Sequence, residues 1–187
     1  MYLPSPVLIG VAFGLSELAL SLSRRAGSDA NAKDRHSLLL IWAVVAAAML
    51  VGVFLALQFP NLTLPHARAL YFVGLVIFLA GLALRWYAIR YLGRWFTVNV
   101  AIAEDQPLID TGPYALMRHP SYTGALMAFL GFALCLGNLT SLMLVVAATV
   151  AVFSWRIHIE EKVLAQAFGQ RWQDYCARTK RLIPGIY

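Results

Sequence analysis

The sequence predicts an all-α membrane protein, built as a polytopic bundle of about five transmembrane helices. The first observation is composition: of 187 residues, 60% are hydrophobic and 13% are charged, whereas an average soluble domain is about 45–50% apolar and about 25% charged. The second is length, because apolar runs approaching 20 residues recur, and that length crosses a hydrocarbon core of about 30 Å. The third is that lysine and arginine concentrate in alternate connections, which is typical of multi-pass chains.

Five apolar segments account for the expected spans, near residues 6–22, 38–58, 67–89, 122–136 and 139–157. The first is not interpreted as a signal peptide, because no basic region precedes it and Arg24 and Arg25 follow it in place of a cleavage site. The last two are short, since about 15 helical residues reach only about 22 Å, and only Gly137 and Asn138 separate them. They predict a hairpin that either spans most of the bilayer or enters it without crossing.

Positive charge gives the expected orientation. The second connection offers only His66 and Arg68, and the fourth has no charge. The first connection, the third connection and the tail carry Arg24, Arg25, Lys33, Arg35, Arg85, Arg90, Arg94, Arg118, Arg156, Lys162, Arg171, Arg178, Lys180 and Arg181. By the positive-inside rule these segments are cytoplasmic, so the N-terminus is outside and the C-terminus is inside. The net charge of +6 is then explained by topology and anionic membrane lipids, without a nucleic-acid partner.

Few residues suggest a metal or a disulfide. Cys135 lies in an apolar segment and Cys176 in the basic tail, so we expect them on opposite sides of the membrane without a disulfide. Neither cysteine has zinc-site spacing, and His158 lacks a partner at such spacing, so no metal site is expected. Glu17, in the first span, either reaches the cytoplasmic interface or lines a cavity.

The segment "GPYALMRHPSYTG", residues 112–124, is the most unusual feature of the cytoplasmic side. Pro113 and Pro120 stiffen it, and Pro120 suits the first turn of the helix that follows. Interfacial positions would explain Arg118 and Tyr122 one at a time, but not so many hydrogen-bonding groups in one rigid loop. A loop of this kind at a helix N-terminus is a good receptor for a carboxylate.

The segment "WRIHIEEKVLAQAFGQRW" carries a second group of polar residues. Arg156 and Glu160 are four residues apart and therefore share one helix face. Arg156 follows directly after an apolar run, and an ionisable residue at that depth usually faces the bundle interior and marks a site. Glu161 and Lys162 lie off that face and are expected in solvent. Upstream, an interfacial aromatic belt is predicted from Trp86, Tyr87, Tyr91, Trp95 and Phe96.

Together with the upstream "LRWYAIRYLGRWFTVNVAIAEDQPLIDTG", these motifs resemble the isoprenylcysteine carboxyl methyltransferase family, and in particular its prokaryotic members. The specific elements are R-H-P-x-Y-x-G, an apolar hairpin, and then E-E-x-x-L-x-x-x-F-G. The chain is interpreted as one membrane domain, 1–187, with a methyltransferase-like core at residues 84–184. The N-terminal helices, residues 1–66, carry no motif.

The resemblance implies S-adenosylmethionine as methyl donor, in a cytoplasmic pocket, with S-adenosylhomocysteine as product. By motif position, the residues implied to bind this cofactor are Gln106, Pro107, Leu108, Ile109, Tyr114, His119, Pro120, Ser121, Tyr122 and Glu160. Gln106 stands where relatives can have histidine, and Asn99 is a further candidate. The family's substrate-side arginine falls on Arg156, which is the expected catalytic residue.

The implied reaction is carboxyl O-methylation of an isoprenylcysteine-like or other lipophilic acid that arrives from the bilayer. A carboxylate is already ionised at neutral pH, so positioning and charge placement suffice and no general base is needed. Two other enzyme classes stay open: a phospholipid or amine N-methyltransferase, and a membrane sterol-type reductase that uses NADPH. A structural membrane protein without catalysis is the remaining alternative. The resemblance to prokaryotic members predicts a bacterial or archaeal inner membrane, and the sequence does not name the methyl acceptor.

Overall fold

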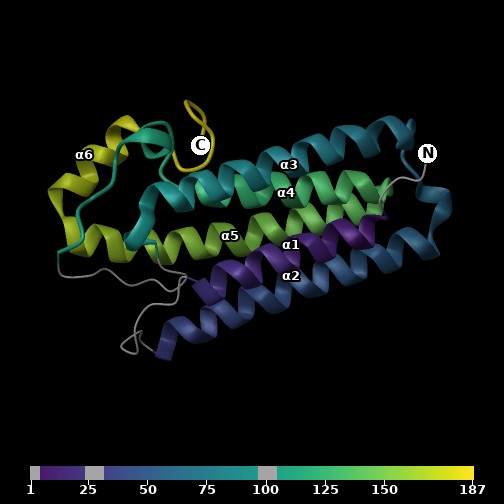
Figure 1. Ribbon diagram of the computed structural model, residues 1–187, viewed down its shortest axis with the longest axis horizontal. Coiled ribbons are helices and arrows are strands. Elements are labelled where there is room, and N and C mark those ends of the chain that lie inside the picture. The colour runs from purple at the N-terminus through teal and green to yellow at the C-terminus, as the bar shows by residue number, and fades with distance from the viewer. Residues whose placement is uncertain (1–4, 24–31, 97–104) are drawn as a thin grey trace.

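The structure is a computed structural model that describes residues 5–23, 32–96 and 105–187. Long helices run up and down in alternation and pack side by side as a bundle (Figure 1). They are α1 (Pro6–Ser23), α2 (Ala32–Gln58), α3 (Ala67–Leu92), α4 (Pro120–Leu136) and α5 (Leu139–Phe168). The described ranges contain helices and isolated bridges but no strand. The predicted all-α membrane bundle is therefore confirmed.

Short elements gather at the two ends of the bundle. The 3-10 helix η1 (Pro60–Leu62) lies in the connection between α2 and α3. At the opposite end, where Figure 1 also shows the C-terminus, lie η2 (Gly93–Trp95), η3 (Gly112–Ala115) and the amphipathic helix α6 (Gln170–Arg178). This end carries all the motifs from which a cytoplasmic site was predicted.

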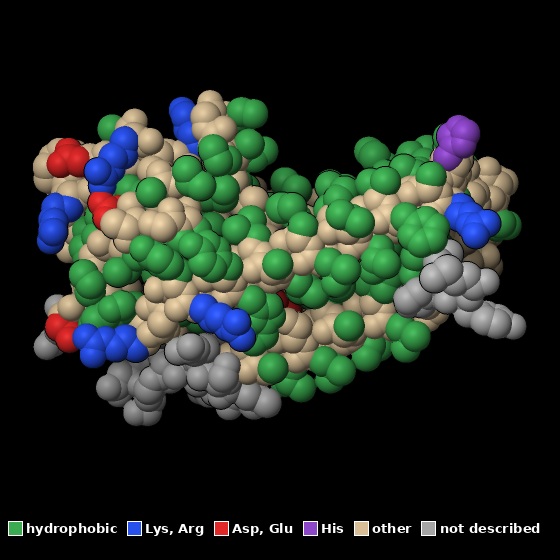
Figure 2. All heavy atoms as spheres, turned by 45° about the horizontal axis from the view of Figure 1, so that its top comes forward, with side chains coloured by type: hydrophobic (Ala, Val, Ile, Leu, Met, Phe, Trp, Pro, Cys, Tyr) green, Lys and Arg blue, Asp and Glu red, His purple; other side chains and the backbone are tan. Residues whose placement is uncertain are grey.

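The surface of the bundle suits a bilayer. By length and composition, the helices that can cross a membrane are Leu38–Gln58, Ala67–Trp95 and Leu139–Phe168, with shorter apolar helices at Pro6–Leu20 and Pro120–Leu136. On the face in view, apolar side chains cover much of the length of the bundle, whereas most charged side chains lie at the end that carries α6 (Figure 2). The protein is thus a multi-pass integral membrane protein.

The α4–α5 hairpin extends to the far end of the bundle. Gly137 ends α4 in the left-handed region with φ 62°, and the Asn138 side chain caps α5 by accepting from the Ser141 N–H at 3.2 Å. The Asn138 side chain also donates to the Phe59 carbonyl at 2.8 Å, and the Leu64 N–H donates to the Gly137 carbonyl at 2.8 Å. The hairpin tip therefore lies beside the α2–α3 connection, and the hairpin is as deep as its neighbours.

Helices α3 and α4 touch through their backbones. A Cβ added to Gly81 would lie 2.6 Å from the Gly124 carbonyl oxygen, and one added to Gly74 would lie 2.6 Å from the Gly131 carbonyl oxygen. Small residues at such spacing allow membrane helices to approach closely. Because a Cβ on Gly124 would also lie 2.6 Å from the Arg85 backbone nitrogen, this contact fixes the first turns of α4 against Arg85.

The orientation of the bundle stays a prediction, with the α6 end inside. Burial raises the pKa of the Cys176 thiol, so this thiol is a slow reporter of accessibility. A Cys176→Ser background can instead carry Asn61→Cys in η1 or Gln173→Cys on α6, both at exposed positions. In intact cells, a membrane-impermeant maleimide should label Asn61→Cys and spare Gln173→Cys until the membrane is opened. The reverse pattern would contradict the orientation.

Candidate active site

A hydrogen bond between α4 and α5 forms the centre of the polar end. The Tyr122 hydroxyl donates to Glu160 Oε2 at 2.8 Å. Tyr122 lies in the first turn of α4, which begins at Pro120 with His119 as N-cap. Tyr122 and Glu160 were both predicted from the sequence as site residues, and the structure places them in contact.

Arg156 lies one turn before Glu160 on α5, and it is the largest of the fully buried side chains in the described chain, at 1% exposure. Its side chain lines the same cavity as Tyr122. A cation and a carboxylate on one face of α5 thus lie near the Tyr122 phenol, which bonds Glu160. The expected common face of Arg156 and Glu160 is present.

The position of Glu161 contradicts the expectation that this residue lies in solvent. Its side chain is only 12% exposed. Its Oε1 accepts from Arg118 Nε at 3.0 Å and lies 3.4 Å from His119 Nε2, and its Oε2 accepts from Arg181 Nε at 2.9 Å. The prediction was wrong because the partners of Glu161 come from the loop before α4 and from the tail. These segments are distant in the sequence, so the residues next to Glu161 do not indicate the contacts.

The tail segment, residues 179–187, forms part of the same site. The Arg118 N–H donates to the Lys180 carbonyl at 2.8 Å, and the His119 N–H donates to the Arg181 carbonyl at 2.9 Å. The Thr123 hydroxyl donates to the Leu182 carbonyl at 2.8 Å. Together with the ion pairs of Glu161, these bonds hold the His119 loop in place. This role was not predicted from the sequence, and the one signal for it was that the methyltransferase-like core, residues 84–184, includes part of the tail.

Tyr114 forms a second buried phenol near Glu160. It is 7% exposed, and the Tyr175 hydroxyl of α6 donates to its carbonyl at 2.7 Å. Burial raises the pKa of the Tyr114 phenol well above its ordinary value, and the nearby Glu160, Tyr175 and Tyr122 act in the same direction. Tyr114 therefore stays protonated at physiological pH, and its hydroxyl donates to the Ala88 carbonyl at 3.4 Å.

The loop before η3 contains the other predicted cofactor contacts. In this loop Pro107 is exposed, and the half-buried positions are Gln106, Leu108 and Ile109. Asp110, next in the chain, forms an ion pair with Arg178 of α6, and the Tyr91 hydroxyl donates to Thr111 Oγ1 at 2.8 Å. These contacts hold the loop beside α6 and α3. Asn99 lies outside the described residues.

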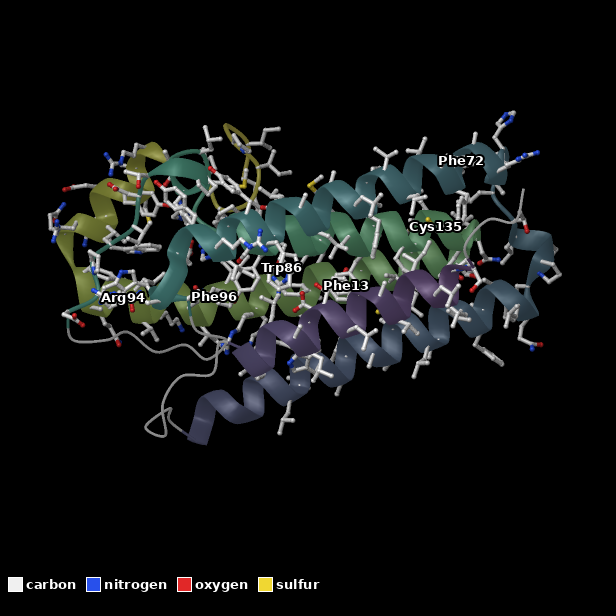
Figure 3. All side chains as sticks on the ribbon, viewed as in Figure 1. Phe13, Phe72, Trp86, Arg94, Phe96 and Cys135 are labelled. Carbon is white, nitrogen blue, oxygen red and sulfur yellow. The ribbon has the colours of Figure 1, made fainter. Side chains whose placement is uncertain are left out.

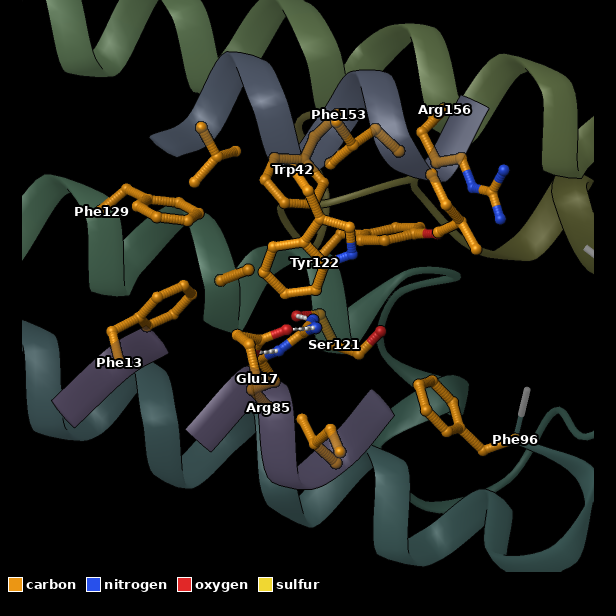
Figure 4. Close-up of a pocket in the computed structure, with 15 residues that line it drawn as sticks. Phe13, Glu17, Trp42, Arg85, Phe96, Ser121, Tyr122, Phe129, Phe153 and Arg156 are labelled. Atoms are coloured by element: carbon orange, nitrogen blue, oxygen red, sulfur yellow. Dashed lines mark hydrogen bonds and ion pairs between the residues drawn. The ribbon is translucent and has the colours of Figure 1, made fainter. Parts of the chain in front are cut away.

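A cavity opens inside the bundle next to Tyr122 and Arg156 (Figure 4). It contains about 670 Å³ of empty space, its open mouth included. Its lining is Phe13, Glu17, Leu20, Leu38, Ile41, Trp42, Val45, Arg85, Phe96, Ser121, Tyr122, Ala125, Phe129, Phe153 and Arg156. Nearly half of these residues come from α1 and α2, although those helices carry no motif.

The cavity wall contains a buried ion pair, which answers the question left open for Glu17. Glu17 is 4% exposed and pairs with Arg85, whose Nη2 lies 2.5 Å from Glu17 Oε2. Arg85 Nη1 also donates to the Ser121 carbonyl at 3.1 Å. Arg85, counted above as a residue flanking a basic connection, instead points into the bundle from α3. Nearby, Trp86 Nε1 donates to Ser16 Oγ at 2.9 Å and fastens α1 to α3 (Figure 3).

The arrangement combines a polar end with an apolar chamber. Phenols, a carboxylate and a buried guanidinium converge at the α6 end of a cavity that is otherwise mostly apolar, apart from Ser121 and the Glu17–Arg85 pair. Among the described residues, no group of three His, Cys, Asp or Glu side chains could hold a metal ion. Such a site can bind a polar molecule and an amphiphile against one another.

Comparison with known proteins gives the family. A profile of the phospholipid methyltransferase family matches residues 69–171. The probable protein-S-isoprenylcysteine O-methyltransferase of Oryza sativa subsp. indica is 34% identical over 141 residues, which cover 74% of this chain and 73% of that protein. The chain belongs to the isoprenylcysteine carboxyl methyltransferase family. The resemblance predicted from the sequence motifs is confirmed.

Other members of the isoprenylcysteine carboxyl methyltransferase family match more of the chain. Protein-S-isoprenylcysteine O-methyltransferase A of Arabidopsis thaliana is 32% identical over 180 residues, which cover 93% of this chain and 88% of that protein. The solved eukaryotic intramembrane Ras methyltransferase of this family superposes with a TM-score of 0.66 at 32% identity, covering 78% of this chain and 52% of that one. This chain thus spans about half the length of that protein. These relatives are eukaryotic, so a prokaryotic source stays a prediction without support from them.

Proposed function

We propose that this membrane methyltransferase transfers a methyl group from S-adenosylmethionine to the carboxylate of a lipophilic acid, of the isoprenylcysteine type, drawn from the bilayer. The observation that carries the proposal is Arg156. This cation is buried at 1% exposure and lines a mostly apolar cavity together with Tyr122, which bonds Glu160. A buried guanidinium beside an apolar chamber suits an acid with a long apolar chain.

The cofactor side fits the polar end of the site. When bound, S-adenosylmethionine supplies an electrophilic methyl group on a positively charged sulfur. Glu160 offers a carboxylate to a cation or a hydroxyl group, and Tyr114 and Tyr122 keep neutral phenols beside it. The remaining residues that would hold the cofactor are the motif positions Gln106, Pro107, Leu108, Ile109, His119, Pro120 and Ser121. Hydrogen bonds of the tail segment fix the His119 backbone among them.

The acceptor side requires orientation more than acid–base chemistry. Arg156 can hold a carboxylate by two parallel hydrogen bonds, and the planar guanidinium then sets the direction of the attacking oxygen. That oxygen is already ionised, so the protein only has to place it in line with the methyl group and exclude water. The apolar lining of the cavity keeps the acceptor chain out of water as well.

A phospholipid or amine acceptor is the second candidate, because the matching family profile carries that description. An amine would have to lose a proton and would bring its cationic form toward Arg156, which repels it. With purified protein and labelled S-adenosylmethionine, the label on an N-acetyl-S-prenylcysteine should be released by mild base, as expected for an ester. Base-stable label on an amine lipid, with none on the acid, would contradict carboxyl methylation.

Removing the polar groups around Glu160 should weaken cofactor binding. Each of Tyr122→Phe, His119→Ala and Glu160→Ala removes a hydrogen-bonding group, at a cost of about 1–3 kcal/mol, so affinity for S-adenosylhomocysteine should fall roughly 5- to 150-fold. Isothermal titration measures this, and His158→Ala is the matched control, because His158 is exposed on the same helix. Wild-type affinity in both His119→Ala and Glu160→Ala would mean that the cofactor lies elsewhere.

A further inference from the structure

An aromatic column runs from the polar end of the site into the middle of the bundle. The ring centroids of His119 and Tyr122 are 5.7 Å apart, and those of Tyr122 and Phe153 are 5.4 Å apart. The column continues from Phe153 to Phe129 at 6.0 Å and from Phe129 to Phe13 at 4.6 Å. From Tyr122 to Phe13, all its members line the cavity. The column therefore forms one continuous wall of the cavity.

The cavity ends at the pair of Phe13 and Phe129. Both rings are buried, at 3% and 2% exposure. One turn beyond Phe13, a Cβ added to Gly10 would lie 3.2 Å from Met49 Cε and 3.3 Å from the Phe132 ring. Phe132 is 1% exposed and does not line the cavity. The layer beyond Phe13 is thus closely packed, and the cavity does not continue through it.

The two ends of the cavity differ in chemistry. Figure 4 shows Phe13 and Phe129 at one end and Arg156 at the other. The ion pair of Glu17 and Arg85 lies on the wall between them. An amphiphilic acid held at Arg156 would extend its apolar chain along the column toward Phe13.

We propose that Phe13, packed against Phe129, limits the length of the apolar chain that an acceptor can place in the cavity. This inference rests on the proposed function, because it takes the cavity as the acceptor site. A chain that ends at the Phe13 ring buries all its apolar surface, whereas each further carbon must bend back or displace the ring. The helix α1, which has no family motif, thereby determines specificity for chain length.

The test compares Phe13→Ala with Phe132→Ala in the full-length protein. Both changes remove a buried phenylalanine from the same core, but only Phe13→Ala lengthens the cavity. The probes are N-acetylcysteines that carry S-geranyl, S-farnesyl or S-geranylgeranyl chains. Binding is measured as the rise in unfolding temperature at fixed probe concentration, and transfer is measured with labelled S-adenosylmethionine.

In the wild type, affinity should rise with chain length and then fall at the first chain that exceeds the cavity. In Phe13→Ala that limit should move up by one isoprene unit, with the relative affinity for the longer chain increasing about tenfold or more. Phe132→Ala should keep the wild-type limit. The same limit in all three proteins, or no limit in the wild type, would overturn the role of Phe13.

The binding and transfer results separate this inference from the proposed function. A limit that moves in Phe13→Ala without any methyl transfer would support the chain-length role and contradict carboxyl methylation. Methyl transfer with an unmoved limit would support the proposed function and overturn the chain-length role.

Discussion

Replacement of Arg156 by alanine is expected to lower kcat/KM by roughly 30- to 5,000-fold while leaving affinity for S-adenosylhomocysteine close to that of the wild type. The size of the fall in kcat/KM follows from the loss of one partner of the buried charge pair that Arg156 would form with the acceptor carboxylate, which costs about 2–5 kcal/mol. The selectivity follows from position, because Arg156 lines the cavity whereas Glu160 lies one turn further along α5, toward the end of the bundle that carries α6. Initial rates with an N-acetyl-S-prenylcysteine and titration with S-adenosylhomocysteine measure the two effects.

The Arg156→Lys variant sharpens this result. Lysine keeps the charge but cannot form the two parallel hydrogen bonds of a guanidinium, so it should recover only part of the activity. Thermal unfolding of both variants shows whether folding is matched, since Arg156 is also buried. Retained turnover in both variants, or a fall in cofactor affinity as large as the fall in activity, would mean that Arg156 does not hold the acceptor.

Breaking the Glu17–Arg85 pair is expected to destabilise the bundle by about 3–5 kcal/mol, because Glu17→Ala leaves an uncompensated cation inside the membrane domain. Arg85 is 9% exposed, and the Trp86–Ser16 hydrogen bond holds its helix against α1. A buried pair can often be replaced as a whole by apolar residues at little cost. The double variant Glu17→Ala, Arg85→Met should therefore be much more stable than Glu17→Ala.

Unfolding of the detergent-solubilised protein measures these differences. Glu17→Gln is a closer control, because it keeps the shape of the side chain and removes only its charge. Equal stability of Glu17→Ala and the double variant would show that the unpaired Arg85 carries no cost. In that case the pair contributes packing alone.

The helical bundle and the α5 side of the candidate site could be predicted from the sequence. Apolar runs located every long helix, and the spacing of Arg156 and Glu160 placed both on the face that meets Tyr122. The pairing of Glu17 with Arg85 could not be predicted, because the two residues are 68 positions apart and the sequence of neither helix indicates which residue it contacts. The cavity lining from α1 and α2 was hidden for the same reason, since aromatic and aliphatic residues in a membrane helix look alike whether they face lipid or a cavity.

The contact between α3 and α4 also decides which parts of the protein can move. Helices whose backbones touch at Gly74, Gly81, Gly124 and Gly131 cannot slide or separate without losing that close packing. Arg85 and the first turn of α4 therefore behave as one rigid body. The tail segment is attached to this body by the hydrogen bonds that Arg118, His119 and Thr123 donate to its carbonyls and by the ion pairs of Glu161. Entry and exit of a soluble donor should thus open the protein on the side of α6 and the tail, while the membrane side stays closed.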